Sequence, residues 1–191
     1  MTADPTASAR RLPRSQRREQ ILAAATTTFA RAGFADTTMD DIASAAGISR
    51  VILYRHFESK DDIYRSALAR VDERIATAVA SVGDAAGTVT ALVTAAAADP
   101  DGFRLLFRHA AREPRFRSFT DRLARQAETA AHQQVAHRIR EPVWARWTAR
   151  LAPMLAIEAV MAWLDLGQPD PEQVVERVER ALAGLVPVPE R

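Results

Sequence analysis

The chain of 191 residues contains no cysteine, and its single lysine is Lys60. Without cysteine there is no disulfide framework, no zinc–thiolate site and no thiol chemistry. No apolar run approaches the roughly 20 residues that a membrane-spanning helix needs. The N-terminal residues carry charge but no following apolar segment of the kind found in signal peptides. We therefore expect a cytoplasmic protein with no membrane partner.

Groups that support catalysis are scarce and scattered. The four histidines are spread along the chain, and neither a His-Glu-x-x-His segment nor a paired-carboxylate arrangement occurs. Enzyme active sites gather titratable groups in one cleft. We predict no catalytic residue, no metal site and no cofactor, and an all-α enzyme is the least favoured interpretation. Glu158 stands alone within an apolar segment, where a buried carboxylate would need a partner.

Positive charge is concentrated toward the N-terminus. The net charge is only +2, but residues 1–70 carry eleven Lys+Arg against eight Asp+Glu. Five of these cations lie at the start of the chain: Arg10, Arg11, Arg14, Arg17 and Arg18. Such an arm suits contact with phosphates or insertion into a minor groove. A solvated tail that contacts nothing explains the same residues equally well.

Apolar residues recur at helical spacing over most of the chain, and no sustained alternation of period two occurs. We therefore predict an all-α fold. The expected helices are 15–32, 37–46, 50–57, 60 to about 83, 88–98, 101–113, 116–140, 144–166 and 171–185. Pro153 predicts a kink or a late start in the 144–166 helix, since proline removes a backbone donor.

The stretch 37–60 predicts two short helices joined by a tight turn. Thr37 or Thr38 is placed to cap the first helix, and Asp41 follows Thr38 at the spacing of a capping box. Gly47 ends that helix, where the chain needs a positive φ. Ser49 is positioned as the N-cap of the second helix.

The second of these helices has one apolar face and one polar face. Leu53 and Phe57, four residues apart, are expected to point inward, which leaves Arg50 and Tyr54 on other faces. Two helices joined by a short turn containing glycine form a helix-turn-helix, which places its second helix in the major groove of DNA.

The pattern T-T-x-x-x-I-A-x-x-A-G-I-S-R-x-x-L-Y-x-H-F-x-S-K, residues 37–60, is very similar to the DNA-binding region of TetR-type transcriptional regulators. The likeness is strong over residues 15 to 65 and extends further only in the all-helical outline. It implies a flexible basic arm (1–14), a helix-turn-helix domain (15–64) and a helical effector and dimerisation domain (65–191). By this resemblance the chain is a one-component repressor that binds a palindromic double-stranded operator as a homodimer and responds to a small molecule of unknown identity.

The resemblance also assigns roles to single residues. Arg50, Val51 and Ile52 fall where base edges are contacted, and Arg50 suits a bidentate pair with guanine. Positions that hold phosphates carry donors of the right reach. The full set of candidate DNA-binding residues is Thr37, Thr38, Ser49, Arg50, Val51, Ile52, Tyr54, His56 and Lys60.

Alternatives stay open for several of these residues. Arg50 can contact a phosphate instead of a base, Tyr54 can pack with only its hydroxyl exposed, and His56 can be a buried structural histidine. Lys60 can pair with Glu58 at the surface. Val51 and Ile52 are bulkier than the residues common at these positions, so a dimeric protein–protein adaptor with a degenerate DNA reader is the main competing interpretation.

The remaining helices are expected to hold the effector and a second copy of the chain. An apolar effector pocket is predicted from Phe103, Phe107, Phe119, Leu123, Trp144, Trp147 and Met154, with Phe116 as a further lining residue and His109, His132, Gln134 or His137 as polar groups. The dimer interface is predicted from Ile157, Val160, Met161, Leu164, Val174, Val178 and Leu182. The alternative is that these apolar faces bury against helices of the same chain.

Overall fold

A computed structural model describes residues 12–82 and 85–186, with side chains throughout except at residues 85 and 86. Every regular element in these two ranges is helical, which confirms the all-α prediction. The elements are α1 (Arg14–Asp36), α2 (Met39–Ala45), α3 (Arg50–Tyr54), α4 (Lys60–Ala80), α5 (Ala85–Ala98), α6 (Pro100–Arg104), a π-helical turn η1 (Leu105–His109), two 3-10 turns η2 (Ala110–Arg112) and η3 (Pro114–Phe116), α7 (Arg117–Val135), α8 (Pro142–Asp165) and α9 (Pro171–Ala183).

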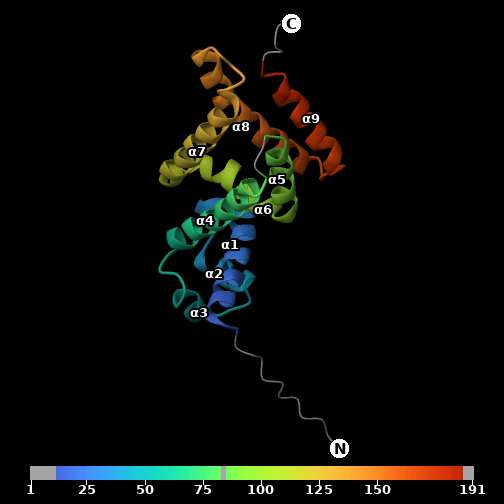
Figure 1. Cartoon of the computed structure of the whole chain (residues 1–191). Coiled ribbons are helices and arrows are strands. Elements are labelled where there is room, and N and C mark those ends of the chain that lie inside the picture. Colours follow the sequence, from blue (N-terminus) through green and yellow to red (C-terminus); the bar gives the residue numbers. More distant parts are fainter. Residues whose placement is uncertain (1–11, 83–84, 187–191) are drawn as a thin grey trace, which may run out of the picture.

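The molecule has two well-separated ends (Figure 1). The short helices α2 and α3 lie at one end, together with the start of α1, and α7, α8 and α9 lie at the other. The long helix α4 and the short α6 lie between them. None of the described helices is both long and apolar enough to cross a membrane. Arg10 and Arg11 of the predicted basic arm fall outside the described residues.

The helix boundaries near α2 and α3 follow from local side-chain chemistry. Gly33 has φ of 80° and ends the regular part of α1, while Gly47 has φ of 64° between α2 and α3. A left-handed backbone of this kind is accessible to glycine without steric cost. The N-caps are Thr38, Ser49 and Ser59, each accepting a backbone N–H of the following helix. These caps confirm the predicted starts of α2, α3 and α4. Helix α3 ends at Tyr54, earlier than the predicted residue 57.

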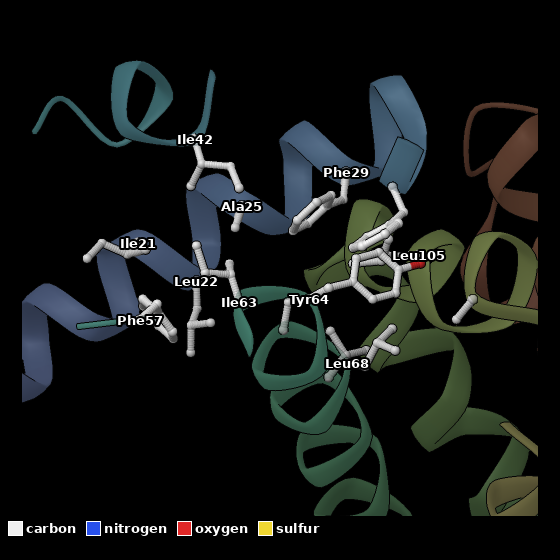
Figure 2. Packing of buried hydrophobic residues seen from close by; sticks show 14 of the residues in the cluster. Ile21, Leu22, Ala25, Phe29, Ile42, Phe57, Ile63, Tyr64, Leu68 and Leu105 are labelled. Atoms are coloured by element: carbon white, nitrogen blue, oxygen red, sulfur yellow. The ribbon is translucent and has the colours of Figure 1, made fainter. Parts of the chain in front are cut away.

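One hydrophobic core joins the first four helices to η1 and η3. Figure 2 shows α1 packed across the start of α4, with Leu105 of η1 beside them. Tyr64 and Phe116 stack with ring centroids 4.4 Å apart, and Phe29 meets Tyr64 edge-on at 4.8 Å. Such aromatic pairs add about 0.5–1.5 kcal/mol beyond the area they bury. The core therefore continues past the predicted domain boundary at residue 64.

A second core lies at the opposite end, between α5, α6, α8 and α9. Four of the residues predicted for the dimer interface belong to it, which corrects that prediction: Val160, Met161, Leu164 and Val178. Each is at most 4 % exposed within a single chain, so none is available to a second copy in this conformation. The other three, which are partly buried against the same core, are Ile157, Val174 and Leu182.

The segment 101–113 is not the single amphipathic helix that its sequence predicts. It divides into α6, the π-helical turn η1 and the 3-10 turn η2. Phe103 packs into the second core, whereas Leu105 and Leu106 pack into the first. The α8 prediction also needs correction, because the helix begins at Pro142 and continues through Pro153. Glu158 lies exposed on α8 and is not a buried carboxylate.

Candidate nucleic-acid interface

Helix α3 is anchored by its apolar residues and presents the others outward. Leu53 is fully buried and Phe57, just beyond the helix, is 1 % exposed. Val51 is 62 % exposed and Tyr54 is 50 % exposed, an unusual amount for large apolar side chains. Arg50 lies with them on the exposed surface. The spacing of these residues therefore produces a helix with one fixed face and one free face, as the sequence predicts.

Polar side chains of α1 form hydrogen bonds to the backbone at the ends of α2 and α3. The guanidinium of Arg18 lies 4.3 Å from the ring centroid of Phe57 and donates to the His56 carbonyl (3.3 Å) and to Ser66 Oγ (3.0 Å). Gln20 Nε2 donates to the Ala46 carbonyl at 2.8 Å, at the end of α2. Arg18 is thus a positioning residue in this structure. In the sequence, nothing about the basic run distinguishes Arg18 from Arg14 or Arg17.

Arg50, the main candidate for base reading, makes an ion pair with Asp40 of α2. Its Nε lies 2.7 Å from Asp40 Oδ1, and both side chains are more than half exposed. Exposed pairs of this kind contribute about 0–1 kcal/mol. The pair therefore orients the guanidinium across the two helices and can open at little cost when a stronger acceptor arrives.

The start of α2 forms a complete capping box. Thr38 Oγ1 accepts the Asp41 N–H (3.2 Å), and Asp41 Oδ2 accepts the Thr38 N–H (2.8 Å). The hydrogen bonds from the Thr38 side chain and backbone hold the pKa of Asp41 below its usual range. Thr37 is 1 % exposed and donates to the Gly33 carbonyl at 2.7 Å. It belongs to the α1–α2 corner, so only Thr38 of the two threonines faces outward.

Lys60 is engaged within the chain, contrary to the expectation of a free phosphate donor. Its Nζ donates to the carbonyls of Phe34 (2.7 Å) and Ala35 (3.1 Å) and lies 4.5 Å from the Phe34 ring centroid. Both carbonyls lie near the C-terminal end of α1, so the ammonium caps that end of the helix. Neither a bridge to Glu58 nor an outward-pointing ammonium is present among the described contacts of this residue.

His56 and Ile52 border the exposed face of α3, and both are partly buried. Burial lowers the pKa of His56, and the nearby charges of Arg14, Arg18 and Arg17 lower it further. A neutral imidazole therefore predominates near neutral pH. It can still donate one ring N–H to a phosphate oxygen.

The predicted effector residues are not brought together in one cavity. Phe103 is buried in the second core, and Phe107 lies between the two cores with its ring centroid 4.6 Å from that of Phe103. Phe119 and Leu123 are partly buried against the first core. Trp144 and Trp147 touch each other edge-on at 5.9 Å between ring centroids, but they are 57 % and 48 % exposed. Met154 is 58 % exposed. Trp144, Trp147 and Met154 are thus exposed on α8, whereas Phe103 is 1 % exposed.

Comparison with known proteins identifies the N-terminal part of the chain. Residues 21–67 match the family model described as "Bacterial regulatory proteins, tetR family". The HTH-type transcriptional activator FasR of Mycolicibacterium smegmatis is 42% identical over 69 residues, 36% of this chain and 32% of FasR. The HTH-type transcriptional repressor KstR2 of Rhodococcus jostii is 44% identical over 85 residues, 42% of each chain. The chain thus matches less than half the length of these curated relatives.

The fold extends the likeness over nearly the whole chain. A TetR-like transcriptional regulator from Rhodococcus sp. RHA1 superposes with a TM-score of 0.80, covering 91% of this chain and 100% of that one, at 22% identity. At this identity the likeness concerns the fold. The sequence match places the tetR-family segment on α1 to α4, which includes the exposed face of α3.

Proposed function

We propose that this chain, TetR-type in its N-terminal domain and in its overall fold, is a one-component transcriptional regulator that binds operator DNA and responds to a small molecule. The observation that carries this proposal is the outward face of α3, where Arg50, Val51 and Tyr54 stand exposed on a helix anchored by Leu53 and Phe57. The named relatives include an activator and a repressor. Repression is the direction we favour.

Within the proposed complex, α3 enters the major groove. Arg50 leaves Asp40 and forms a bidentate pair with guanine O6 and N7, which contributes about 1–3 kcal/mol of discrimination against other bases. Val51 makes apolar contact with a thymine methyl. The hydroxyl of Tyr54 donates to a phosphate oxygen, which fixes the register without reading sequence. The Thr38 hydroxyl donates to Asp41 Oδ2 at 2.6 Å, so it donates to a phosphate only after leaving that carboxylate.

The proposed regulator acts as a homodimer on a palindromic operator, because one α3 contacts only one half-site. Half-sites lie about 34–36 Å apart, so the paired surface must hold two copies of α3 at that spacing. The face that we now propose for pairing is the exposed apolar surface of α8, which carries Trp147 and Met154 one heptad apart. It lies at the end of the molecule opposite α3 (Figure 1).

Dimerisation is tested by sedimentation equilibrium of the full chain. Exposed side chains of this size on one helix are typical of interaction surfaces. Met154→Asp places a charge on the proposed surface without disturbing the core, so the variant should sediment as a monomer. Arg146→Asp, on another exposed part of α8, is the matched control. A parent chain that is monomeric at micromolar concentration contradicts the paired arrangement.

DNA binding is tested by genomic footprinting followed by mobility-shift titration on the fragments recovered. Arg50→Ala should weaken binding by at least tenfold, and Tyr54→Phe should weaken it less, because the aromatic ring remains. Asp40→Asn should hold or raise the affinity up to about fivefold, since it removes a weak competitor for Arg50. Arg146→Ala, far from α3, should bind like the parent.

The salt dependence of binding separates this proposal from its competitor. Counterion release predicts that affinity falls steeply as salt rises. The exposure of Val51 is the one feature that favours a protein-binding α3. If affinity for DNA is insensitive to salt and unaffected by Arg50→Ala, α3 is a protein contact and the chain is an adaptor.

A further inference from the structure

A cavity of about 230 Å³ lies between α4, α5 and α6, away from the outer surface of α8. Its apolar lining, which includes the methyl group of Thr94, comes from Val71, Ile75, Ala78, Thr94, Ala95, Ala98 and Phe103. Two charged residues, Arg74 and Asp99, complete the wall. An apolar cavity with one charged edge is the form expected of a small-molecule site.

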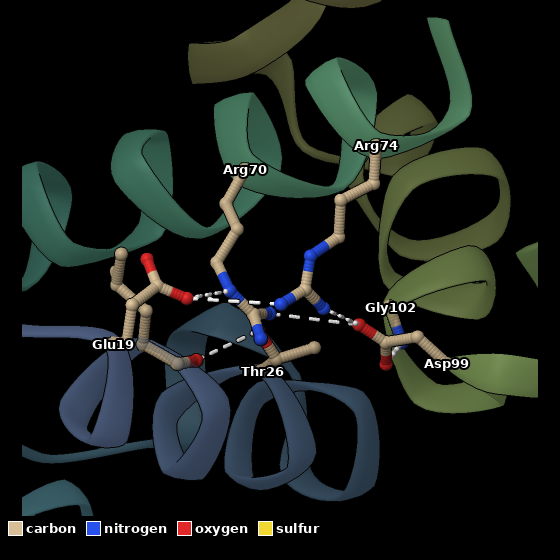
Figure 3. Close-up of polar contacts among 7 residues, drawn as sticks. Glu19, Thr26, Arg70, Arg74, Asp99 and Gly102 are labelled. Carbon is tan, nitrogen blue, oxygen red and sulfur yellow. Dashed lines mark hydrogen bonds and ion pairs between the residues drawn. The ribbon is translucent and has the colours of Figure 1, made fainter. Parts of the chain in front are cut away.

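The charged edge belongs to an ion-pair network that ties three segments together (Figure 3). Arg70 and Arg74 of α4 both face Glu19 of α1, with Arg70 Nε to Glu19 Oε2 at 2.8 Å and Arg74 Nη2 to the same oxygen at 3.7 Å. On the other side, Arg70 Nη1 and Arg74 Nη1 each lie 3.5 Å from Asp99 Oδ2. Two guanidinium groups thus share one carboxylate on each side.

The ion pairs of Asp99 with the two arginines are long because its carboxylate also caps α6. Its Oδ1 accepts the Gly102 N–H at 2.9 Å as the N-cap of α6. A Cβ on residue 102 would stand 2.7 Å from the Asp99 carboxyl, so glycine is required for this close approach. Charge-assisted hydrogen bonds are about 2.7–2.9 Å long, and both arginine contacts to Asp99 exceed that. Among the described residues, the buried Arg70 Nη1 has no hydrogen-bond partner.

We propose that this cavity binds a small apolar carboxylate, with its alkyl or aryl body against Phe103 and Ile75 and its carboxylate on Arg74, the guanidinium in the cavity wall. Both ion-pair contacts of Arg74, 3.7 Å to Glu19 and 3.5 Å to Asp99, are longer than a charge-assisted hydrogen bond. A ligand carboxylate supplies a closer acceptor, which a cationic or purely apolar molecule does not. Arg74 is about half exposed and is reached from solvent. The inference rests on the proposed function where it names the effector class and where it predicts a change in DNA affinity.

A ligand in the cavity affects the position of α3 through its effect on the contacts of α1. Arg70 and Arg74 hold Glu19, and the neighbouring residues of α1, Arg18 and Gln20, hold the ends of α3 and α2. A ligand carboxylate that draws the two arginines away from Glu19 breaks the ion pairs that join α1 to α4 near the helix-turn-helix. The affinity of the full chain for its DNA therefore changes at least fivefold when the cavity is filled.

The test uses octanoate, octylamine and octan-1-ol as probes of one chain length and three head groups. Isothermal titration of the full-length protein should show one octanoate per chain, with octan-1-ol at least tenfold weaker and octylamine without measurable binding. Arg74→Gln should lose at least tenfold in octanoate affinity, and Arg74→Lys should recover part of it. Ala95→Leu, which fills the cavity and leaves the ion pairs in place, should abolish binding. Arg150→Gln on α8 is the charge control and should bind like the parent.

The proposal is overturned if octan-1-ol binds as tightly as octanoate, or if Ala95→Leu binds octanoate unchanged. Its failure differs from failure of the proposed function. A chain that binds operator DNA but not octanoate refutes the ligand assignment alone. A chain that binds octanoate through Arg74 but binds no DNA refutes the regulator alone and supports the cavity.

Discussion

Replacing Lys60 with methionine separates two roles that the same residue could have. In the structure its ammonium closes the C-terminal end of α1 by donating to the Phe34 and Ala35 carbonyls at 2.7 and 3.1 Å, and it lies over the Phe34 ring. The resemblance to TetR-type regulators implies instead a contact with DNA phosphate. Methionine has a similar length and keeps the apolar stem, but it removes the charge and all three donors.

The expected loss of stability is about 1–3 kcal/mol. Hydrogen bonds that involve a charged group contribute about 1.5–3 kcal/mol where they are buried, and the cation–π contact adds about 0.5–1 kcal/mol at a partly exposed site. Lys60 is only partly buried, so solvent reduces both contributions. In the variant, the Phe34 and Ala35 carbonyls lose their donor and are hydrated instead, which does not stabilise the fold.

Urea denaturation followed by circular dichroism measures the unfolding free energy of Lys60→Met, with Arg55→Met as an exposed control expected within about 0.5 kcal/mol of the parent. Salt titration of operator binding then measures the number of phosphate contacts. If Lys60 is structural, the stability falls and the salt slope is unchanged. A variant of parental stability whose salt slope falls by about one unit would refute the capping role and restore the phosphate contact.

Three further changes test other parts of the structure. Thr38→Ala removes the hydroxyl of the α2 capping box and should lower the unfolding free energy by about 1 kcal/mol in urea. Tyr64→Phe keeps the ring contacts with Phe29 and Phe116 but removes a buried hydroxyl that has no partner among the described residues, so the melting temperature should hold or rise. Because the pKa of His56 is lowered in the folded state, its neutral form stabilises the fold above about pH 6.5, and this contribution is lost as the pH falls through the lowered pKa. His56→Gln should therefore flatten the fall in unfolding free energy below that pH.

The helix-turn-helix could be predicted from the sequence because its determinants are local. Thr38, Ser49 and Ser59 each cap a helix whose first residues follow immediately, and Gly47 sits where a left-handed backbone is needed. Leu53 and Phe57 are buried by the same spacing that exposes Tyr54. A few residues on either side are enough to establish each of these features.

The roles of cationic residues were less accessible, because they depend on segments far apart in the chain. Arg18 reaches His56 and Ser66, and Lys60 reaches the end of α1 more than twenty residues earlier. In both stretches, the sequence does not distinguish a cation that contacts DNA from one that holds another segment of the chain in place. Sequence alone likewise assigned Val160 and Leu164 to a dimer surface, although α5 and α9 cover them within one chain. Apolar character reports that a face is buried and does not identify what buries it.

The interruption at η1 divides between the two cores a segment that the sequence predicts as one helix. A continuous helix from 101 to 113 would have placed Phe103, Leu106 and Phe107 along one stripe, facing one core. A π-helical turn contains more residues per turn than an α-helix, so it rotates the residues that follow it relative to those before. Phe103 consequently points to the second core and beside the α4–α5 cavity, while Leu106 enters the first core. Because this short segment packs against both cores, we expect a ligand that displaces Phe103 to strain also the contacts that Leu105 and Leu106 make in the first core.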